Sequence, residues 1–215
     1  MLLANIITDA VSNLTDWLED ISAEWWFLVV ILVVAFLDSV IPIVPSETAV
    51  IIGGVAAGSG DQNLWMVIGA GALGAFLGDN TAYFIGSRFA PWFERRAETR
   101  EKTAKRLVWA HDQIEKRGGM LLITARFIPG GRTVLTLSCG ITEQRWRWFA
   151  PWVAVAAIIW ATYAAGLGYI FGQQFEDNHT LAFVFAFAAA LSVTVAVEVV
   201  RHFRNKRREA SPQGS

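Results

Sequence analysis

Long apolar stretches alternate with polar segments along the chain and indicate helices that cross a membrane. Four stretches stand out, at residues 25–41, 64–85, 148–171 and 181–200. Each approaches the ~20 residues that a helix needs to cross ~30 Å of hydrocarbon, although the first is short. Tryptophans mark their edges, where amphipathic rings favour the headgroup layer: Trp25, Trp26, Trp65, Trp146 and Trp148.

Two shorter apolar stretches, 42–58 and 120–141, are interrupted by proline and glycine. Such segments make poor spanning helices and are typical of re-entrant hairpins, which enter and leave the membrane on one side. By contrast, residues 1–24 place apolar and acidic side chains on opposite faces at helical spacing. This pattern predicts an N-terminal amphipathic surface helix, and its acidic face favours packing on the protein over binding to anionic lipid.

Composition agrees with a membrane protein. Of the 215 residues, 54% are hydrophobic and 17% are charged, against roughly 25% charged in an average soluble domain. A soluble protein of this size could not cover so much apolar surface. The single cysteine, Cys139, and three scattered histidines form no metal-ligand set. We therefore expect no metal, no cofactor and no nucleic-acid partner.

Lysine and arginine are absent from residues 1–87 and then gather in two segments. Nine lie within 88–117 and five within the tail 201–215. The positive-inside rule places both segments in the cytoplasm, whereas the acidic connection 173–180 faces outward. With four spans in a membrane domain of residues 25–200, both termini are cytoplasmic. The cytoplasmic segment is then 88–119, and the two hairpins enter from opposite sides.

A faint internal repeat agrees with this topology. Residues 47–50 (ETAV) match 132–135 (RTVL), and 83–89 (YFIGSRF) match 169–175 (YIFGQQF) in tyrosine, glycine and phenylalanine. Each unit is a hairpin followed by a long span, and the topology gives the two units opposite orientations. Inverted repeats with broken helices are typical of secondary transporters, whose site lies where the repeats meet. The predicted fold is an all-α integral membrane protein built as an inverted repeat.

Five ionisable residues lie within apolar sequence: Asp38, Glu47, Asp79, Arg126 and Arg132. Each would cost ~2.5–3.5 kcal/mol at the centre of a membrane, so we expect them to pair. Asp38 and Glu47 are candidates for binding a proton or a cation, with Asp79 and Ser46 in supporting positions. Alternatively, Asp38 reaches the outer interface and caps a turn. Likewise, Ser46 and Glu47 can simply cap the start of a helix.

Arg126 and Arg132 flank a segment that contains Gly130 and Gly131. The glycines permit a tight turn that frees backbone N–H groups at the start of the next helix. Such groups together with two guanidinium forks predict an anion site, for which phosphate is the best match. The alternative is that both arginines only neutralise the embedded acids.

These motifs resemble the DedA family of membrane proteins, which share the VTT domain. The matching segments are 36–47 (FLDSVIPIVPSE), 74–86 (GAFLGDNTAYFIG), 126–132 (RFIPGGR) with 139–140, and 160–172. The resemblance implies two facing re-entrant hairpins and proton-dependent flipping of undecaprenyl phosphate or other lipids across the cytoplasmic membrane. The family's two embedded acids and two arginines fall on Asp38, Glu47, Arg126 and Arg132. The first acid is commonly glutamate, so Asp38 is a departure.

We therefore expect a lipid transporter whose partners are a membrane lipid and protons, with self-association left open. An ion or drug–proton antiporter, or a membrane-homeostasis factor without lipid transport, is the alternative. A lipid-phosphate phosphatase is disfavoured, because enzymes of the phosphatidic-acid type need a Pro-Ser-Gly-His segment. Here Pro45 and Ser46 are followed by Glu47 and Thr48, so no enzymatic activity is expected.

Overall fold

The computed structural model describes most of the membrane domain. The described residues are 22, 24–41, 46–99, 114, 118–126, 128, 130–175, 181–190 and 192. Every element in these ranges is a helix, which confirms the all-α prediction for this part of the chain. The rest of the predicted helix 1–24, most of the segment 88–119 beyond residue 99, and the tail 201–215 lie outside the described residues.

Two short helices open the described part. They are α2 (Phe27–Val40) and α3 (Ser46–Ser59), each of 14 residues and therefore about 21 Å long, less than the ~30 Å of a hydrocarbon core. Ile41 has extended backbone (φ −124°, ψ 97°). It precedes Pro42, and proline disfavours helical backbone in the residue before it. The described part of the predicted hairpin 42–58 is consequently one helix. The helix before it, α2, covers most of the stretch 25–41 that the apolar pattern assigned to a span.

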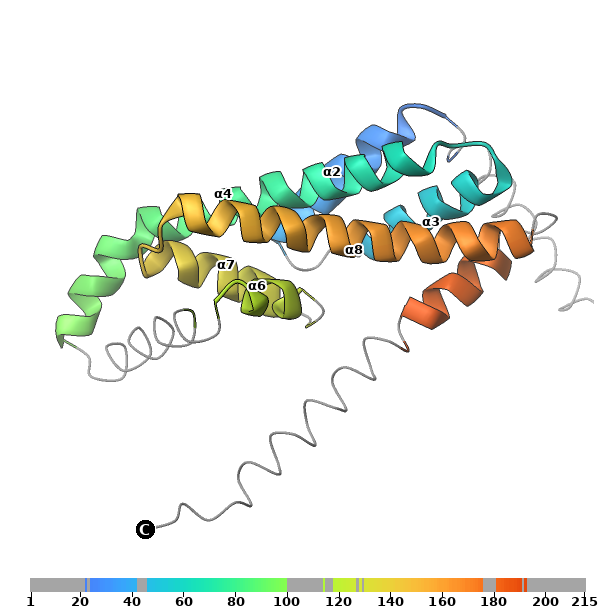
Figure 1. Cartoon of the computed structure of the whole chain (residues 1–215). Helices are drawn as coiled ribbons and strands as arrows, with labels where there is room; N and C mark the ends of the chain where they lie inside the picture. The colour runs from blue at the N-terminus through green and yellow to red at the C-terminus, as the bar shows by residue number, and fades with distance from the viewer. Residues whose placement is uncertain are drawn as a thin grey trace, which may run out of the picture.

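Two long helices, α4 (Leu64–Thr99) and α8 (Trp146–Gln174), lie side by side along the molecule (Figure 1). Among the described residues, α8 is the one helix long and apolar enough to cross a membrane. The helices Phe27–Val40 and Leu181–Ala190 are apolar but shorter. The polar pair Asp79 and Asn80 interrupts the apolar sequence of α4, and both residues are buried.

The stretch 120–141 is occupied by two helices with a break between them. They are α6 (Met120–Ala125) and α7 (Gly131–Ile141). Gly130 precedes α7 with left-handed backbone (φ 68°), a conformation that glycine adopts without the steric cost of a side chain. The Gly131 N–H donates to the Ile128 carbonyl at 2.9 Å and closes the turn. That N–H is therefore not available to an anion, contrary to the prediction for this glycine.

The short helices α3 and α7 pack on the long helix of the other half, whereas α2 packs on α4 of its own half. The first-half helix α3 packs on α8, and the second-half helix α7 packs on α4. Glycines line both contacts, and a Cβ on any of them would collide with the partner's backbone: Gly54, Gly58, Gly168 and Gly172 between α3 and α8, and Gly86 and Gly140 between α4 and α7. Small residues of this kind let helix backbones approach closely. Each half is thereby anchored to the long helix of the other.

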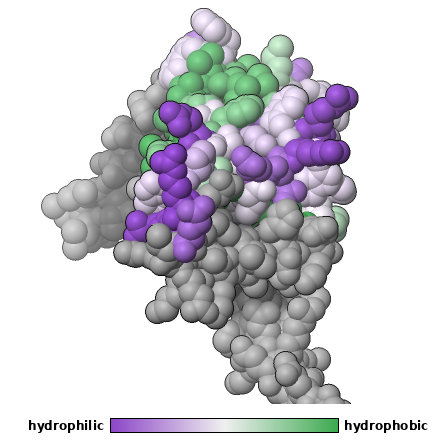
Figure 2. Space-filling view, turned by 90° about the vertical axis from the view of Figure 1, so that its left-hand side faces the viewer, coloured by the Kyte–Doolittle hydropathy of each residue, from purple (hydrophilic) through white to green (hydrophobic). Residues whose placement is uncertain are grey.

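The two ends of the described part differ in their basic residues. Four exposed arginines lie where α4 approaches its end and where α7 turns into α8: Arg88, Arg95, Arg145 and Arg147. Figure 2 faces this end and shows hydrophilic residues gathered next to a hydrophobic patch. At the opposite end, the turn 60–63 between α3 and α4 contains Asp61 and no basic residue.

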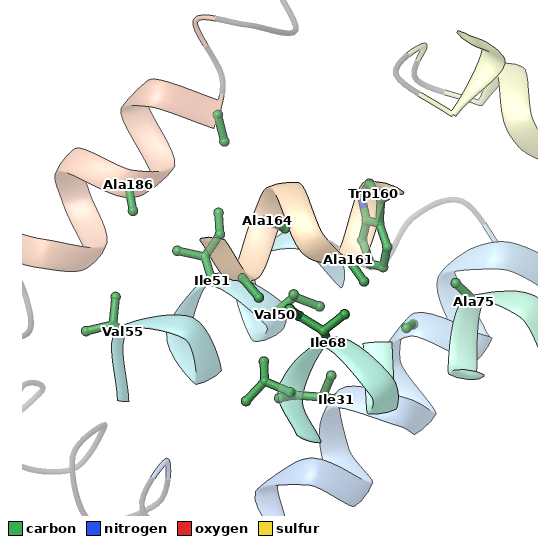
Figure 3. Close-up of a cluster of buried hydrophobic side chains, with 14 of the residues drawn as sticks. Ile31, Val50, Ile51, Val55, Ile68, Ala75, Trp160, Ala161, Ala164 and Ala186 are labelled. Carbon is green, nitrogen blue, oxygen red and sulfur yellow. The ribbon is translucent and has the colours of Figure 1, made fainter. Parts of the chain in front are cut away.

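The main hydrophobic core lies among α2, α3, α4 and α8. Ile31, Val50 and Ile51 are fully buried there beside Ala161 (Figure 3). Ala186 of the helix Leu181–Ala190 packs against the same cluster. This core ends next to the buried charges, because Trp160 belongs to the cluster and also contacts an arginine.

Candidate functional site

Four of the five embedded charges meet near the points where α2 ends and where α6 gives way to α7. Asp38 is in the last turn of α2, and Asp79 lies in the middle of α4. Arg126 directly follows α6, and Arg132 is in the first turn of α7. The predicted pairing of acids with arginines is therefore present, and each acid comes from a different helix.

Arg126 and Asp79 form a fully buried ion pair. Arg126 Nη1 donates to Asp79 Oδ2 at 2.6 Å, and each side chain is 1% exposed. The Arg126 guanidinium carbon also lies 5.3 Å from the centre of the Trp160 ring, within the range of a cation–π interaction. Arg126 is thus fixed between a carboxylate of α4 and an aromatic ring of α8.

Arg132 and Asp38 form a second ion pair, which protein covers less completely. Arg132 Nη2 donates to Asp38 Oδ2 at 2.8 Å, with side-chain exposures of 10% and 13%. The Ser46 hydroxyl, at the start of α3, donates to the same oxygen at 2.6 Å. Arg132 Nε lies 3.6 Å from Asp79 Oδ1, which links the two pairs. The four charges form one network with no net charge.

Hydrogen bonds of Thr133 and Ser39, next to the charged residues, hold the helices of this network together. The Thr133 hydroxyl donates to the Ser39 carbonyl at 3.2 Å, and the Ser39 hydroxyl lies within bonding distance of the Ala35 and Ala75 carbonyls. These contacts join α7, α2 and α4 immediately beside the charged residues. The positions of Asp38 and Arg132 are therefore set by packed helices rather than by a loose loop.

Glu47 does not join the cluster. It lies in the first turn of α3, half-buried, and makes no ion pair within the described residues. Ser46 is the first residue of α3, and its hydroxyl is bonded to Asp38, a partner that a simple helix cap would not require. The structure thus brings Asp38, Asp79, Ser46 and both arginines together and leaves Glu47 at the edge.

Two further features were not assigned from the sequence. Trp160 contacts Arg126 although 34 positions separate them, so no local spacing could reveal the contact. Next to the cluster, the Tyr83 hydroxyl donates to the Gln144 carbonyl at 2.5 Å, and Trp146 Nε1 donates to Asn80 Oδ1 at 2.8 Å. These two bonds tie the α7–α8 turn to α4. No group of metal-ligating side chains occurs among the described residues.

Comparison with known proteins places the chain in a family. The VTT domain matches residues 41–170, more than half of the chain. The protein DedA of Escherichia coli K12 is 26% identical, with 98% of this chain and all of that protein aligned. An uncharacterised membrane protein of Mycobacterium tuberculosis H37Rv is 28% identical over 82% of this chain and 80% of its own length. An uncharacterised membrane protein of Synechocystis is 28% identical over 89% of this chain and 90% of its own length.

No solved structure matches the chain significantly. The domain match includes three of the four clustered charges, Asp79, Arg126 and Arg132, and the relatives are named as membrane proteins. The apolar helices, the buried charges and these matches agree on one assignment. The chain is a membrane protein and belongs to the DedA family of VTT-domain proteins.

Proposed function

We propose that this protein carries a lipid phosphate, undecaprenyl phosphate or another phospholipid, across the cytoplasmic membrane, with its movement coupled to that of protons. The observation that carries the proposal is the pair of buried arginines facing two aspartates at the breaks between short helices. Guanidinium groups are well suited to bind phosphate through two hydrogen bonds at once, and an arginine whose carboxylate partner can be displaced can supply them. The partly exposed Arg132–Asp38 pair is the displaceable one.

In this proposal, four helices span the membrane, and α6 and α7 form a re-entrant hairpin from the cytoplasmic side. The chain around α3 enters from the opposite side, and both termini are cytoplasmic. The charged ends support this orientation, because the four exposed arginines lie at one end only of the described part. The positive-inside rule assigns that end to the cytoplasm.

Coupling to protons follows from the charge balance of the cluster. Two aspartates and two arginines are neutral together, so a bound phosphate adds uncompensated negative charge to a site that is almost dry. A phosphate that takes Arg132 leaves Asp38 without its ionic partner. A proton taken up by Asp38 then offsets part of the added negative charge. Binding and protonation then occur together, and release reverses both, as alternating access to a fixed site requires.

The test uses purified protein in proteoliposomes loaded with a labelled lipid phosphate. Lipid translocation and release of inorganic phosphate are measured in the same vesicles, with and without a pH gradient. We expect gradient-dependent translocation and no phosphate release. Phosphate release would identify a phosphatase, and proton-coupled movement of an ion or drug without lipid movement would identify an antiporter. Either result contradicts the proposal.

Substitution of the two candidate acids tests the coupling. Asp38→Asn imitates the protonated form, so it should still move lipid down a gradient but lose the response to pH. Glu47→Gln should keep most of that response, because Glu47 makes no ion pair in the described cluster. Glu143→Gln, an exposed position in the α7–α8 turn, is the matched control. A normal pH response in Asp38→Asn with a lost response in Glu47→Gln would transfer the coupling role to Glu47.

A further inference from the structure

Arg126 is held by two contacts, yet two of its guanidinium nitrogens have no hydrogen-bond partner among the described residues. Nη1 is bonded to Asp79, and the face of the group lies against Trp160. The side chain is 1% exposed, but Nε and Nη2 have no hydrogen-bond partner among the described residues. Buried donors without partners are rare, because the loss of their hydration is not compensated. Two on one side chain point to a ligand.

The geometry of the guanidinium group specifies what that ligand offers. Nε and Nη2 lie on the same edge of the plane, and their N–H bonds run nearly parallel. This edge binds two oxygens of one carboxylate or phosphate at once. Asp79 occupies Nη1, the nitrogen outside this edge, and so leaves both of these donors free. An anion with two terminal oxygens on one atom fits this arrangement.

Arg132 differs from Arg126 in this respect. Its Nη2 is bonded to Asp38, and its Nε lies 3.6 Å from Asp79 Oδ1. Both of its equivalent donors thus already face carboxylates. A phosphate must displace an acid to bind Arg132, whereas binding to Nε and Nη2 of Arg126 breaks no hydrogen bond or ion pair among the described residues.

We propose that the Nε/Nη2 edge of Arg126 is the primary binding edge for two terminal phosphate oxygens, and that Trp160 and Asp79 are positioning residues that hold it. This inference rests on the proposed function and adds an order of events: phosphate binds Arg126 first, and then competes with Asp38 for Arg132. Trp160 comes from α8 and Asp79 from α4, so the two long helices of the molecule jointly orient one arginine.

The test measures binding to the full-length protein in detergent by calorimetry. The probes are farnesyl phosphate, as a short polyprenyl phosphate, and inorganic phosphate. Arg126→Lys keeps the charge but loses the paired N–H bonds, so farnesyl phosphate should bind at least ~10-fold more weakly. Trp160→Phe should weaken binding in the same direction. Arg147→Lys, on the exposed first turn of α8, should bind like the wild type.

A second readout separates positioning from general destabilisation. In protein labelled with ¹⁵N-arginine, the Arg126 Nε–H resonance, assigned by its loss in Arg126→Lys, should move when farnesyl phosphate is added. In Trp160→Phe, this resonance should already be displaced without ligand, while the thermal unfolding midpoint stays within a few degrees of the wild type.

The outcomes are distinct. If the wild type binds and only the Arg132 resonance moves, or if Arg126→Lys binds normally, the inference is wrong although the proposed function stands. If the wild type binds neither probe, the proposed function itself fails. Movement of the Arg126 resonance with either probe supports the binding edge. Tighter binding of farnesyl phosphate then assigns a lipid headgroup, and equal affinities assign free phosphate.

Discussion

Removal of the Asp79 carboxylate should be among the most damaging single changes to the described part of this protein. Asp79→Leu replaces the carboxylate with a somewhat larger apolar side chain of the same branching. It leaves Arg126 as an unpaired charge whose side chain is 1% exposed. Breaking a buried ion pair by removing one partner costs about 3–5 kcal/mol. That loss is a large share of the 5–15 kcal/mol that typically separates a folded domain from its unfolded state.

Asp38→Leu provides the comparison. The Asp38 and Arg132 side chains are 13% and 10% exposed, so protein encloses the remaining arginine less completely than it encloses Arg126. We expect a loss of about 1.5–3 kcal/mol, the range for a hydrogen bond to a charged group. Unfolding in mixed micelles, followed by tryptophan fluorescence during a denaturant titration, measures both losses against the wild type.

A double substitution decides whether the unpaired charge is the cause. In Asp79→Leu with Arg126→Met, no uncompensated charge remains at the pair, so the double variant should be more stable than Asp79→Leu alone. Equal losses for Asp79→Leu and Asp38→Leu, or no recovery in the double variant, would refute the reasoning from burial.

Two more predictions concern packing and orientation. Gly74→Ala should lower the free energy of unfolding by about 1–3 kcal/mol, because a Cβ there meets the backbone of α2. On the same helix, a Cβ at Gly69 meets nothing within 4 Å, so Gly69→Ala should leave stability unchanged or raise it by about 0.5–1 kcal/mol. Chemical denaturation measures both variants. For orientation, Cys139 is first replaced by alanine, and single cysteines are introduced at Gln62 and Arg100. An impermeant thiol reagent added to intact cells should label position 62 and spare position 100, and the reverse pattern would invert the proposed topology.

The charged cluster could be predicted from the sequence, because its cause is visible in the sequence itself. Ionisable residues within apolar sequence must find partners, and the chain holds both signs. The identity of the partners depends on which helices pack together. Because α7 packs on α4, the arginines meet Asp79, which the sequence placed in a supporting position. On α3, Ser46 reaches Asp38, whereas Glu47, the next residue, makes no ion pair within the described residues, a difference that the apolar pattern does not contain.

Helix lengths show a similar limit. The apolar pattern indicates that residues 25–41 are helical, and α2 covers most of that stretch. The pattern does not show that the helix ends at Val40, because apolar residues continue beyond the break at Ile41. Proline at position 42 carries the relevant signal. Because of this proline, helix α2 ends close to Asp38. A continuous spanning helix would have held the carboxylate in its middle.

The crossed packing of the two halves also has a consequence for synthesis of the chain at the ribosome. The glycine-lined face of α3 fits α8, but Trp146, the first residue of α8, is made 87 positions after Ser59, the last residue of α3. During that interval α3 has emerged without the helix that covers it. The first half must therefore be retained, by the insertion machinery or by lipid, until the second half arrives. Maturation is then a single late assembly step, and a chain cut between α4 and α6 should regain its structure only when both fragments are made together.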